Sequence, residues 1–232
     1  PAPQKLAEIL SDAHVEALRA RVRDCKPGIG PTEQWTPPQQ PVSPTDESHT
    51  TSFSIADNEG NLICLTQSLG SVFGSGVVVP GTGLCLNNFL YWADVNPQSP
   101  NRVKPGDQLP MCMAPSISTK DGVPILALGT PGSYGILQTQ PQAMVQYVDF
   151  GLPLQQAIEA PRGRLTDGAA VLLESRVSPD VHADLRKLGH DVTTGPEWTW
   201  SVGGMQGVAI NPETGVFTGG CDPRRDGYCV PA

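Results

Sequence analysis

The feature that most constrains this chain is a proline-rich segment near its start. Six prolines lie between Pro27 and Pro44, mixed with glutamine, threonine and serine. Proline donates no backbone hydrogen bond, and a segment of this composition can neither hold a strand ladder nor bury a core. We therefore expect residues 27–49 to form an exposed, mobile tether that ends at His49.

A helix is expected before this tether. Over residues 4–23 the side chains that form one face recur with helical spacing, and the pattern stops near Cys25. The residues on this face are Leu6, Ile9, Leu10, His14, Leu18 and Val22. The sequence thus predicts one helix in the N-terminal part of the chain.

A β-hairpin is expected directly after the tether. Residues 51–57 alternate in the manner of a strand, residues 58–61 read Asn-Glu-Gly-Asn, and residues 62–68 return as a second strand. A glycine-rich stretch follows over residues 70–83. The new strand would hold the residue after the tether rigidly in a sheet.

The rest of the chain predicts a mixture of strands and helices. Residues 93–110 are rich in proline and asparagine and suggest a long surface or lid-forming loop. The expected elements are strands at 84–86, 116–119 and 124–128, a helix opened by residues 129–135 and running to about Phe150, helices at 154–160 and 179–188, and strands within 202–210 and 216–218. Hairpins on both sides of a central helical pair favour a layered α+β fold over a parallel doubly wound sheet.

Composition excludes several classes of function. The formal net charge is -8, and nucleic-acid binding would need clustered lysine and arginine that the chain lacks. No apolar run approaches the roughly 18 residues of a membrane helix, so we expect no membrane segment in this fragment. The six cysteines show no CxxC pair and no zinc spacing, and we expect neither a metal nor a cofactor. Cys221 and Cys229 either stay free thiols or pair in an oxidising compartment, and the sequence assigns no compartment.

Thr50 is the candidate nucleophile. A threonine hydroxyl is a weak nucleophile unless a base stands beside it, and an N-terminal threonine carries that base as its own α-amino group. Such a residue must first be released by cleavage. A flexible tether followed by Thr50 and a rigid hairpin is the arrangement that this requirement predicts. The alternative is that Thr50 only begins a strand.

The residues around Thr50, and further motifs downstream, resemble the small subunit of γ-glutamyltransferases. The matching segments are residues 49–54, Asp57, Gly60-Asn61, Thr66, Ser68, 73–76, 86–88, 113–116, 120–122, 129–132, 149–152 and 160–162. They keep the family's order and nearly its spacing over roughly residues 50–225. The resemblance implies a four-layer αββα sandwich of the N-terminal-nucleophile (Ntn) hydrolases.

The same resemblance implies a division of the chain. Residues 1–26 would be the end of a large subunit, residues 27–49 the linker before the processing site, and residues 50–232 the small, catalytic subunit. The bond between His49 and Thr50 would be cleaved by attack of the Thr50 hydroxyl on the preceding carbonyl. The partners implied are the large subunit of the same proenzyme and a small-molecule amide substrate.

The resemblance also implies roles for catalytic residues. Thr50 would attack an amide carbonyl and form an acyl-enzyme that water or an amine resolves. Gly132 and Ser133 occupy the family's paired-glycine position, whose backbone N–H groups form the oxyanion hole, although Ser133 replaces the second glycine. Ser68 matches a family threonine whose hydroxyl touches the nucleophile.

The substrate pocket departs from the family's pattern. Gly70 stands where an asparagine is usual, and Phe89 and Trp92 replace a glutamine and an aspartate that would grip an α-amino group. Met111 and Cys112 replace a pair of serines. We expect these residues to make the acyl pocket smaller or more apolar.

Three functions therefore stay open at this point. The first is an autoprocessing amidohydrolase or acyltransferase acting on γ-glutamyl or related small acyl amides. The second is an amidase without γ-glutamyl activity, similar to oxamate amidohydrolases or cephalosporin acylases, and the third is a non-catalytic homologue that is never cleaved. Asn88 is expected to brace the pocket loop or to contact the substrate.

Overall fold

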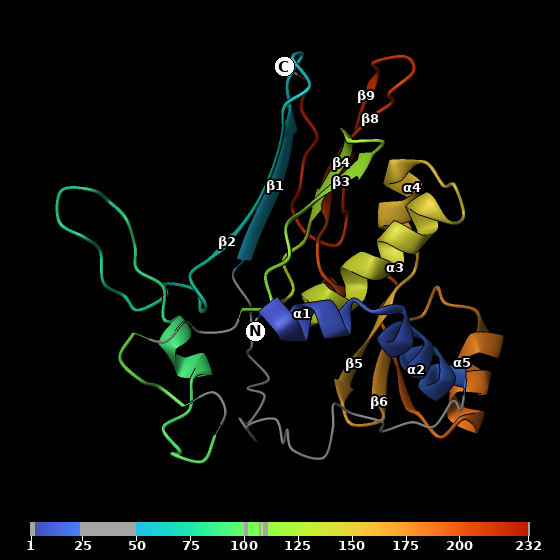
Figure 1. The fold of residues 1–232 in the computed structure, drawn as a ribbon, viewed down its shortest axis with the longest axis horizontal. Coiled ribbons are helices and arrows are strands. Elements are labelled where there is room, and N and C mark those ends of the chain that lie inside the picture. The colour runs from blue at the N-terminus through green and yellow to red at the C-terminus, as the bar shows by residue number, and fades with distance from the viewer. Residues whose placement is uncertain (1–2, 24–49, 100–101, 107, 109–110, 232) are drawn as a thin grey trace.

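The computed structural model describes residues 3–23, 50–99, 102–106, 108 and 111–231. A long hairpin lies beside a larger sheet, helices α3 and α4 lie on the other side of that sheet, and a smaller sheet with helix α5 lies at one end (Figure 1). The predicted tether, with His49, lies outside the described residues.

The hairpin predicted after the tether is confirmed. Strands β1 (Thr50–Ala56) and β2 (Leu62–Ser68) pair in antiparallel fashion. The carboxylate of Asp57 holds the turn between them, because it accepts hydrogen bonds of 2.9 Å from the backbone N–H groups of Glu59 and Asn61. The turn that the sequence suggests is thus closed by an aspartate in its usual capping role.

The two faces of this hairpin differ in chemistry. Small, mostly polar side chains form one face, in the cross-strand pairs Thr50–Ser68, Ser52–Thr66 and Ser54–Cys64. Apolar side chains form the other face, in the pairs Phe53–Leu65 and Ile55–Ile63. These four apolar residues are 36–53% exposed. The hairpin therefore turns its polar face towards the rest of the described fold.

A four-stranded antiparallel sheet packs against this polar face. Its strands, in spatial order, are β3 (Ser116–Lys120), β4 (Val123–Gly129), β8 (Gln206–Ile210) and β9 (Phe217–Cys221). The predicted hairpin of β3 and β4 is confirmed, and its turn places Asp121 and Gly122 at φ values of 53° and 80°. Two such residues in succession suit the twist of a two-residue hairpin turn.

Gly129 lets the hairpin and this sheet approach closely. A Cβ atom at this position would overlap Ser52 Oγ and would lie 2.9 Å from Cys64 Sγ. Close by, Ser54 Oγ donates a hydrogen bond of 3.1 Å to the carbonyl oxygen of Gln206 on β8. The contact between the two sheets is therefore made by small and polar groups.

Helices α3 (Ile136–Val148) and α4 (Leu154–Glu159) cover the other face of the sheet. The main hydrophobic core lies between these helices and the sheet, and it consists of Leu126, Leu128, Ala143, Leu154, Ile158, Met205 and Ala209. Each of these side chains is at most 4% exposed. Hairpin, sheet and helices thus form three consecutive layers of a mixed α/β fold.

A second, smaller sheet was not predicted from the sequence. It contains β5 (Gly163–Asp167), β6 (Ala170–Glu174) and β7 (Asp191–Gly195), with β6 and β7 parallel. Helix α5 (Pro179–Lys187) was predicted and connects this parallel pair. A connecting helix of this kind is what parallel neighbours require.

Two other predictions need correction. The single helix expected over residues 4–23 is two helices, α1 (Pro3–Ile9) and α2 (Asp12–Arg23). Ser11 separates them, because its Oγ atom accepts the backbone N–H of His14 as an N-cap does. Residues 84–86 form no strand, and Cys85 makes only an isolated bridge to Val78.

Two further observations concern the whole described chain. Cys221 and Cys229 are free thiols, and the Cys229 thiol is hydrogen-bonded to that of Cys221. Among the described helices, none combines the length and the hydropathy of a bilayer-spanning segment.

Candidate active site

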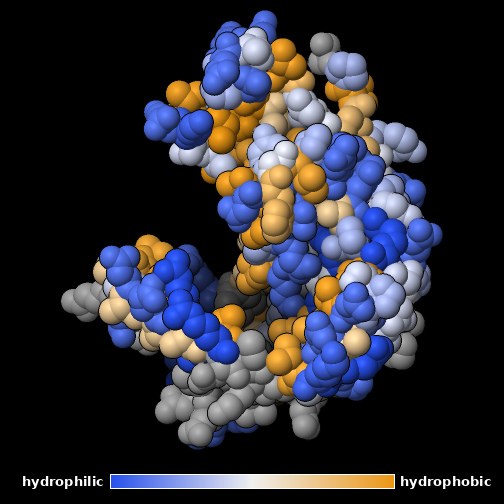
Figure 2. Space-filling model, turned by 90° about the vertical axis from the view of Figure 1, so that its right-hand side faces the viewer, coloured by the Kyte–Doolittle hydropathy of each residue, from blue (hydrophilic) through white to orange (hydrophobic). Residues whose placement is uncertain are grey.

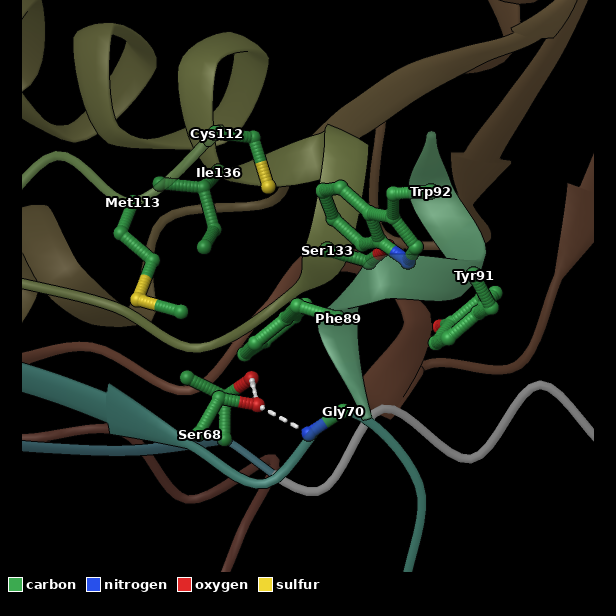
Figure 3. Close-up of a pocket in the computed structure, with 10 residues that line it drawn as sticks. Ser68, Gly70, Phe89, Tyr91, Trp92, Cys112, Met113, Ser133 and Ile136 are labelled. Carbon is green, nitrogen blue, oxygen red and sulfur yellow. Dashed lines mark hydrogen bonds between the residues drawn. The ribbon is translucent and has the colours of Figure 1, made fainter. Parts of the chain in front are cut away.

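Thr50 and Ser68 lie side by side at the open end of the hairpin. The Thr50 hydroxyl donates a hydrogen bond of 3.0 Å to Ser68 Oγ, which also accepts the backbone N–H of Gly70 at 3.0 Å. Both bonds are drawn in Figure 3. Thr51 is exposed and pairs with Gln67, so strand alternation places it on the opposite face. Of the two neighbouring threonines, Thr50 is the one that lines a pocket.

The turn after β4 brings a strained backbone to this pocket. Gly132 has a φ of 143°, and Ser133, the first residue of the short 3-10 helix η2 (Ser133–Gly135), has a φ of 54°. A non-glycine residue in this left-handed region costs on the order of 1 kcal/mol. The serine that replaces a glycine in the sequence pattern therefore keeps the backbone conformation that glycine adopts more easily.

The pocket is narrow, with a cavity volume of about 10 Å³, which is roughly the room that one water molecule needs. It is lined by Thr50, Ser68, Gly70, Phe89, Tyr91, Trp92, Cys112, Met113, Ser133 and Ile136. Figure 3 shows the side chains of Phe89, Met113 and Ile136 gathered over the Ser68 end of the hairpin. The pocket joins segments that lie far apart in the sequence.

Aromatic rings form one wall of this pocket. The 3-10 helix η1 (Phe89–Trp92) supplies three of them, and Phe89 is buried. Phe89 meets Trp92 edge to face at 5.3 Å, and Trp92 stacks on Tyr134 at 4.7 Å with ring planes 14° apart. The wall is thus connected to η2 by ring packing.

A buried thiol also lines the pocket. Cys112 is 8% exposed, and burial raises the pKa of its thiol to about 11. The thiol is therefore neutral at physiological pH, as a thiolate would require solvation or a close positive charge. Cys112 contributes an apolar, uncharged group to the lining.

Most of the site residues expected from the sequence meet at this pocket, and four do not. Gly132 directly precedes the lining residue Ser133 but is itself absent from the lining. Asn88 binds Ser71, to which its amide nitrogen donates a hydrogen bond of 2.7 Å, and it is absent from the lining. Met111 is 38% exposed and also lies outside the lining. His49, the other residue of the expected cleavage point, lies outside the described residues.

Sequence reasoning did not single out Met113, Tyr134 or Ile136 as site residues. Met113 and Ile136 line the pocket, and Tyr134 stacks on a residue that does. Tyr134 follows the glycine-rich turn directly, and this adjacency was the only signal in the sequence. Within the described ranges, no group of three or more His, Cys, Asp or Glu side chains is arranged to hold a metal ion.

Outside the pocket lining, four charged side chains form a buried ionic cluster: Arg162, Glu174, Asp222 and Arg224. Arg224 binds Glu174 through two hydrogen bonds of 2.6 and 2.7 Å and binds Asp222 at 3.0 Å, while Arg162 binds Asp222 at 2.5 Å. The side chains of all four residues are at most 1% exposed. Buried charges are tolerated when they are paired and hydrogen-bonded in this way.

A comparison with solved structures shows which class of fold this is. The γ-glutamyltranspeptidase from Pseudomonas nitroreducens complexed with L-DON is similar to this chain with a TM-score of 0.68 and 30% identity. The match covers 78% of this chain and 99% of that chain. The fold is therefore that of an Ntn-type hydrolase chain.

Sequence comparison places the chain within a family. The family model described as gamma-glutamyltranspeptidase matches residues 1–232, and the chain belongs to this family. The acylase ACY 1 proenzyme of Pseudomonas sp. (strain SE83) is 33% identical over 97% of this chain, which corresponds to 38% of that relative. The glutathione hydrolase proenzyme of Bacillus subtilis (strain 168) is 33% identical over 79% of this chain and 31% of its own length. The chain thus spans about a third of the length of these curated relatives.

Proposed function

We propose that this chain is the catalytic part of an autoprocessing amide hydrolase in which Thr50 is the nucleophile. The observation that supports this proposal most is the contact between Thr50 and Ser68 at the mouth of a pocket that Gly70 and Ser133 also line. Thr50 follows the proline-rich stretch in the sequence and begins strand β1, which is where a nucleophile released by cleavage would lie.

The proposal divides the chain as the sequence suggests. Residues 1–26 belong to the large subunit, residues 27–49 form the linker, and residues 50–232 form the small subunit. The apolar outer face of the β1–β2 hairpin supports a missing partner layer, because neighbouring apolar pairs on a strand surface are normally covered. In this proposal the large subunit covers that face and completes the four-layer αββα sandwich.

The chemistry begins with release of the nucleophile. Thr50 Oγ1 attacks the carbonyl carbon of residue 49, the peptide bond shifts to an ester, and water hydrolyses the ester to free the α-amino group. That amine then takes the hydroxyl proton when Thr50 attacks a substrate amide, and the leaving amine departs protonated. Water resolves the acyl-enzyme. The N–H groups of Gly132 and Ser133 stabilise the negative charge that develops on the carbonyl oxygen.

The pocket lining points to an uncharged acyl group. The lining contains aromatic, aliphatic and small residues, and Cys112 is neutral because its pKa is raised to about 11. An ammonium group placed there would lose its hydration without gaining a carboxylate from the described lining. We propose that the preferred substrates carry a small, predominantly apolar acyl chain. Hydrolysis of γ-glutamyl amides is the second candidate, because a similar relative is named a glutathione hydrolase proenzyme.

Two measurements on the complete proenzyme test this proposal. Wild type should separate into two chains on a denaturing gel, with Thr50 as the N-terminal residue of the smaller one. Thr50→Ala should remain a single chain, whereas the matched control Thr51→Ala should be processed. A wild-type protein that stays uncut would favour the non-catalytic homologue and defeat the proposal.

Substrate preference is measured on the processed enzyme. We expect kcat/KM for butyryl-p-nitroanilide to exceed that for γ-glutamyl-p-nitroanilide by about tenfold or more, since an unpaired buried charge costs more than the roughly 1.4 kcal/mol that a tenfold ratio represents. Oxamate and a glutaryl cephalosporin side chain complete the set. A clear preference for the γ-glutamyl compound would reject the proposed preference for apolar acyl chains. It would not affect the proposal that Thr50 is the nucleophile.

A further inference from the structure

Thr130 lies at the start of the turn that carries Gly132 and Ser133. Its side chain is fully buried, at 0% exposure. Its hydroxyl donates a hydrogen bond of 2.7 Å to the carbonyl oxygen of Pro131 and accepts the backbone N–H of Gly204 at 3.1 Å. One hydroxyl thus joins two backbone segments that are distant in the sequence.

The second segment fits against the turn with no room for a side chain. Gly203 has a φ of 94°, and a Cβ atom there would lie 2.6 Å from Thr130 Oγ1 and 3.0 Å from the carbonyl oxygen of Pro131. A Cβ atom on Gly132 would in turn lie 3.4 Å from Gly203 Cα. The two backbones are therefore packed directly on each other, with the Thr130 hydroxyl as the polar contact between them.

The buried ionic cluster holds the segment that contains Gly203 and Gly204 at both ends. Glu174 accepts the backbone N–H of Thr199 at 3.2 Å, and Asp222 accepts the backbone N–H of Met205 at 3.1 Å. Both carboxylates are fixed by buried arginines. The segment 199–205 is thus a rigid support, and Thr130 connects the turn to it.

We propose that Thr130 is a positioning residue whose hydroxyl holds the backbone N–H groups of Gly132 and Ser133 in the geometry required for the oxyanion. This inference rests on the proposed role of those two residues. Ser133 adds a reason, because its left-handed φ of 54° persists only where surrounding contacts enforce it. The oxyanion forms in the transition state, so a misplaced turn lowers kcat and leaves substrate binding nearly unchanged.

The test uses the complete, processed proenzyme with Thr130→Val and Thr130→Ser. Valine keeps the shape and removes the hydroxyl, and we expect kcat to fall about tenfold or more with KM within about twofold, since loss of one oxyanion donor alone costs more than that. Serine keeps the hydroxyl and should restore most of kcat. Active sites are counted by acyl-enzyme burst, so that unprocessed protein does not affect the value.

Thr194→Val is the control. Thr194 lies on β7 of the smaller sheet, and its hydroxyl is hydrogen-bonded to Nδ1 of His182 at 3.1 Å. We expect this variant to keep kcat. If Thr130→Val retains kcat as well as Thr194→Val does, or if Thr130→Ser loses as much as the valine variant, the positioning role is wrong. Should the valine variant not fold, Thr130→Ala takes its place under the same criteria. Failure of wild type to process would instead reject the proposed function.

Discussion

Trp92 stacks face to face on Tyr134, with ring centroids 4.7 Å apart. The two rings come from η1 and η2, so they connect the wall of the acyl pocket with the turn proposed to bind the oxyanion. A residue proposed to select the acyl group is therefore in direct contact with a residue of the turn proposed to bind the oxyanion. Changes at Trp92 should affect specificity first.

Trp92→Asp should shift the preference of the enzyme towards γ-glutamyl amides. It introduces a carboxylate where the family is expected to carry one, and a charge-assisted contact to an ammonium group contributes about 1.5–3 kcal/mol. We expect the ratio of kcat/KM for γ-glutamyl-p-nitroanilide over butyryl-p-nitroanilide to rise about tenfold or more. Trp92→Asn is the control, because asparagine has nearly the same size as aspartate but carries no charge. An equal shift in both variants would show that size, and not charge, decides.

Ser68→Ala should slow turnover while Ser68→Thr should preserve it. Ser68 Oγ accepts hydrogen bonds from both the Thr50 hydroxyl and the Gly70 N–H, and alanine would leave both donors without this acceptor. We expect kcat to fall about tenfold, which corresponds to loss of one or two modest hydrogen bonds. Single-turnover kinetics on processed enzyme measure the effect. Unchanged acylation in the alanine variant would show that Ser68 has no part in orienting Thr50.

Cys112 should resist alkylation until the pH is high. Burial raises the pKa of its thiol to about 11, and only the thiolate reacts. Because the pKa of Cys112 is shifted upward, the fraction of the residue present as thiolate is small at pH 8. This fraction rises about tenfold for each pH unit up to roughly pH 10. Peptide mapping after iodoacetamide treatment measures the rate at this one residue, with Cys112→Ser as the blank. A rate that levels off near pH 9 would contradict the raised pKa.

Glu174→Gln should destabilise the fold strongly. Glu174 is fully buried and binds Arg224 through two hydrogen bonds, so the substitution leaves an arginine charge uncompensated. Removing one partner of a buried pair costs about 3–5 kcal/mol. Urea unfolding monitored by tryptophan fluorescence gives the free energy of unfolding. Lys187→Gln breaks the exposed pair with Asp184 and should change that energy by less than about 1 kcal/mol.

Local patterns in the sequence predicted the parts of the fold that are themselves local. The β3–β4 hairpin was predicted because Asp121 and Gly122 provide its turn directly. The sheet of β5, β6 and β7 was missed because its strands are short and β7 pairs with β6 only after the α5 crossover. The break at Ser11 was missed because helical spacing continues on both sides of a serine that caps the second helix.

The candidate site shows the same limit. Thr50, Ser68 and the turn at Gly132 were predicted, since motif order and the chemistry of an N-terminal nucleophile indicate them. The stacking of Tyr134 on Trp92 depends on how η1 folds back across the molecule, which no local pattern encodes. The hydroxyl of Thr130 was likewise hidden, because its partner Gly204 belongs to a distant segment.

The hairpin of β1 and β2 is inverted relative to an ordinary surface hairpin, with serine and threonine facing inward and phenylalanine, isoleucine and leucine facing water. Figure 2 shows a deep hollow on one face of the molecule, with apolar residues along parts of its rim. The chain therefore exposes apolar side chains to solvent, and exposed apolar patches favour association. If the chain of residues 1–232 is produced alone, we therefore expect it to self-associate and to bind hydrophobic dyes. Its solubility should increase when it is produced together with the proposed large subunit, which would cover the apolar face of the hairpin.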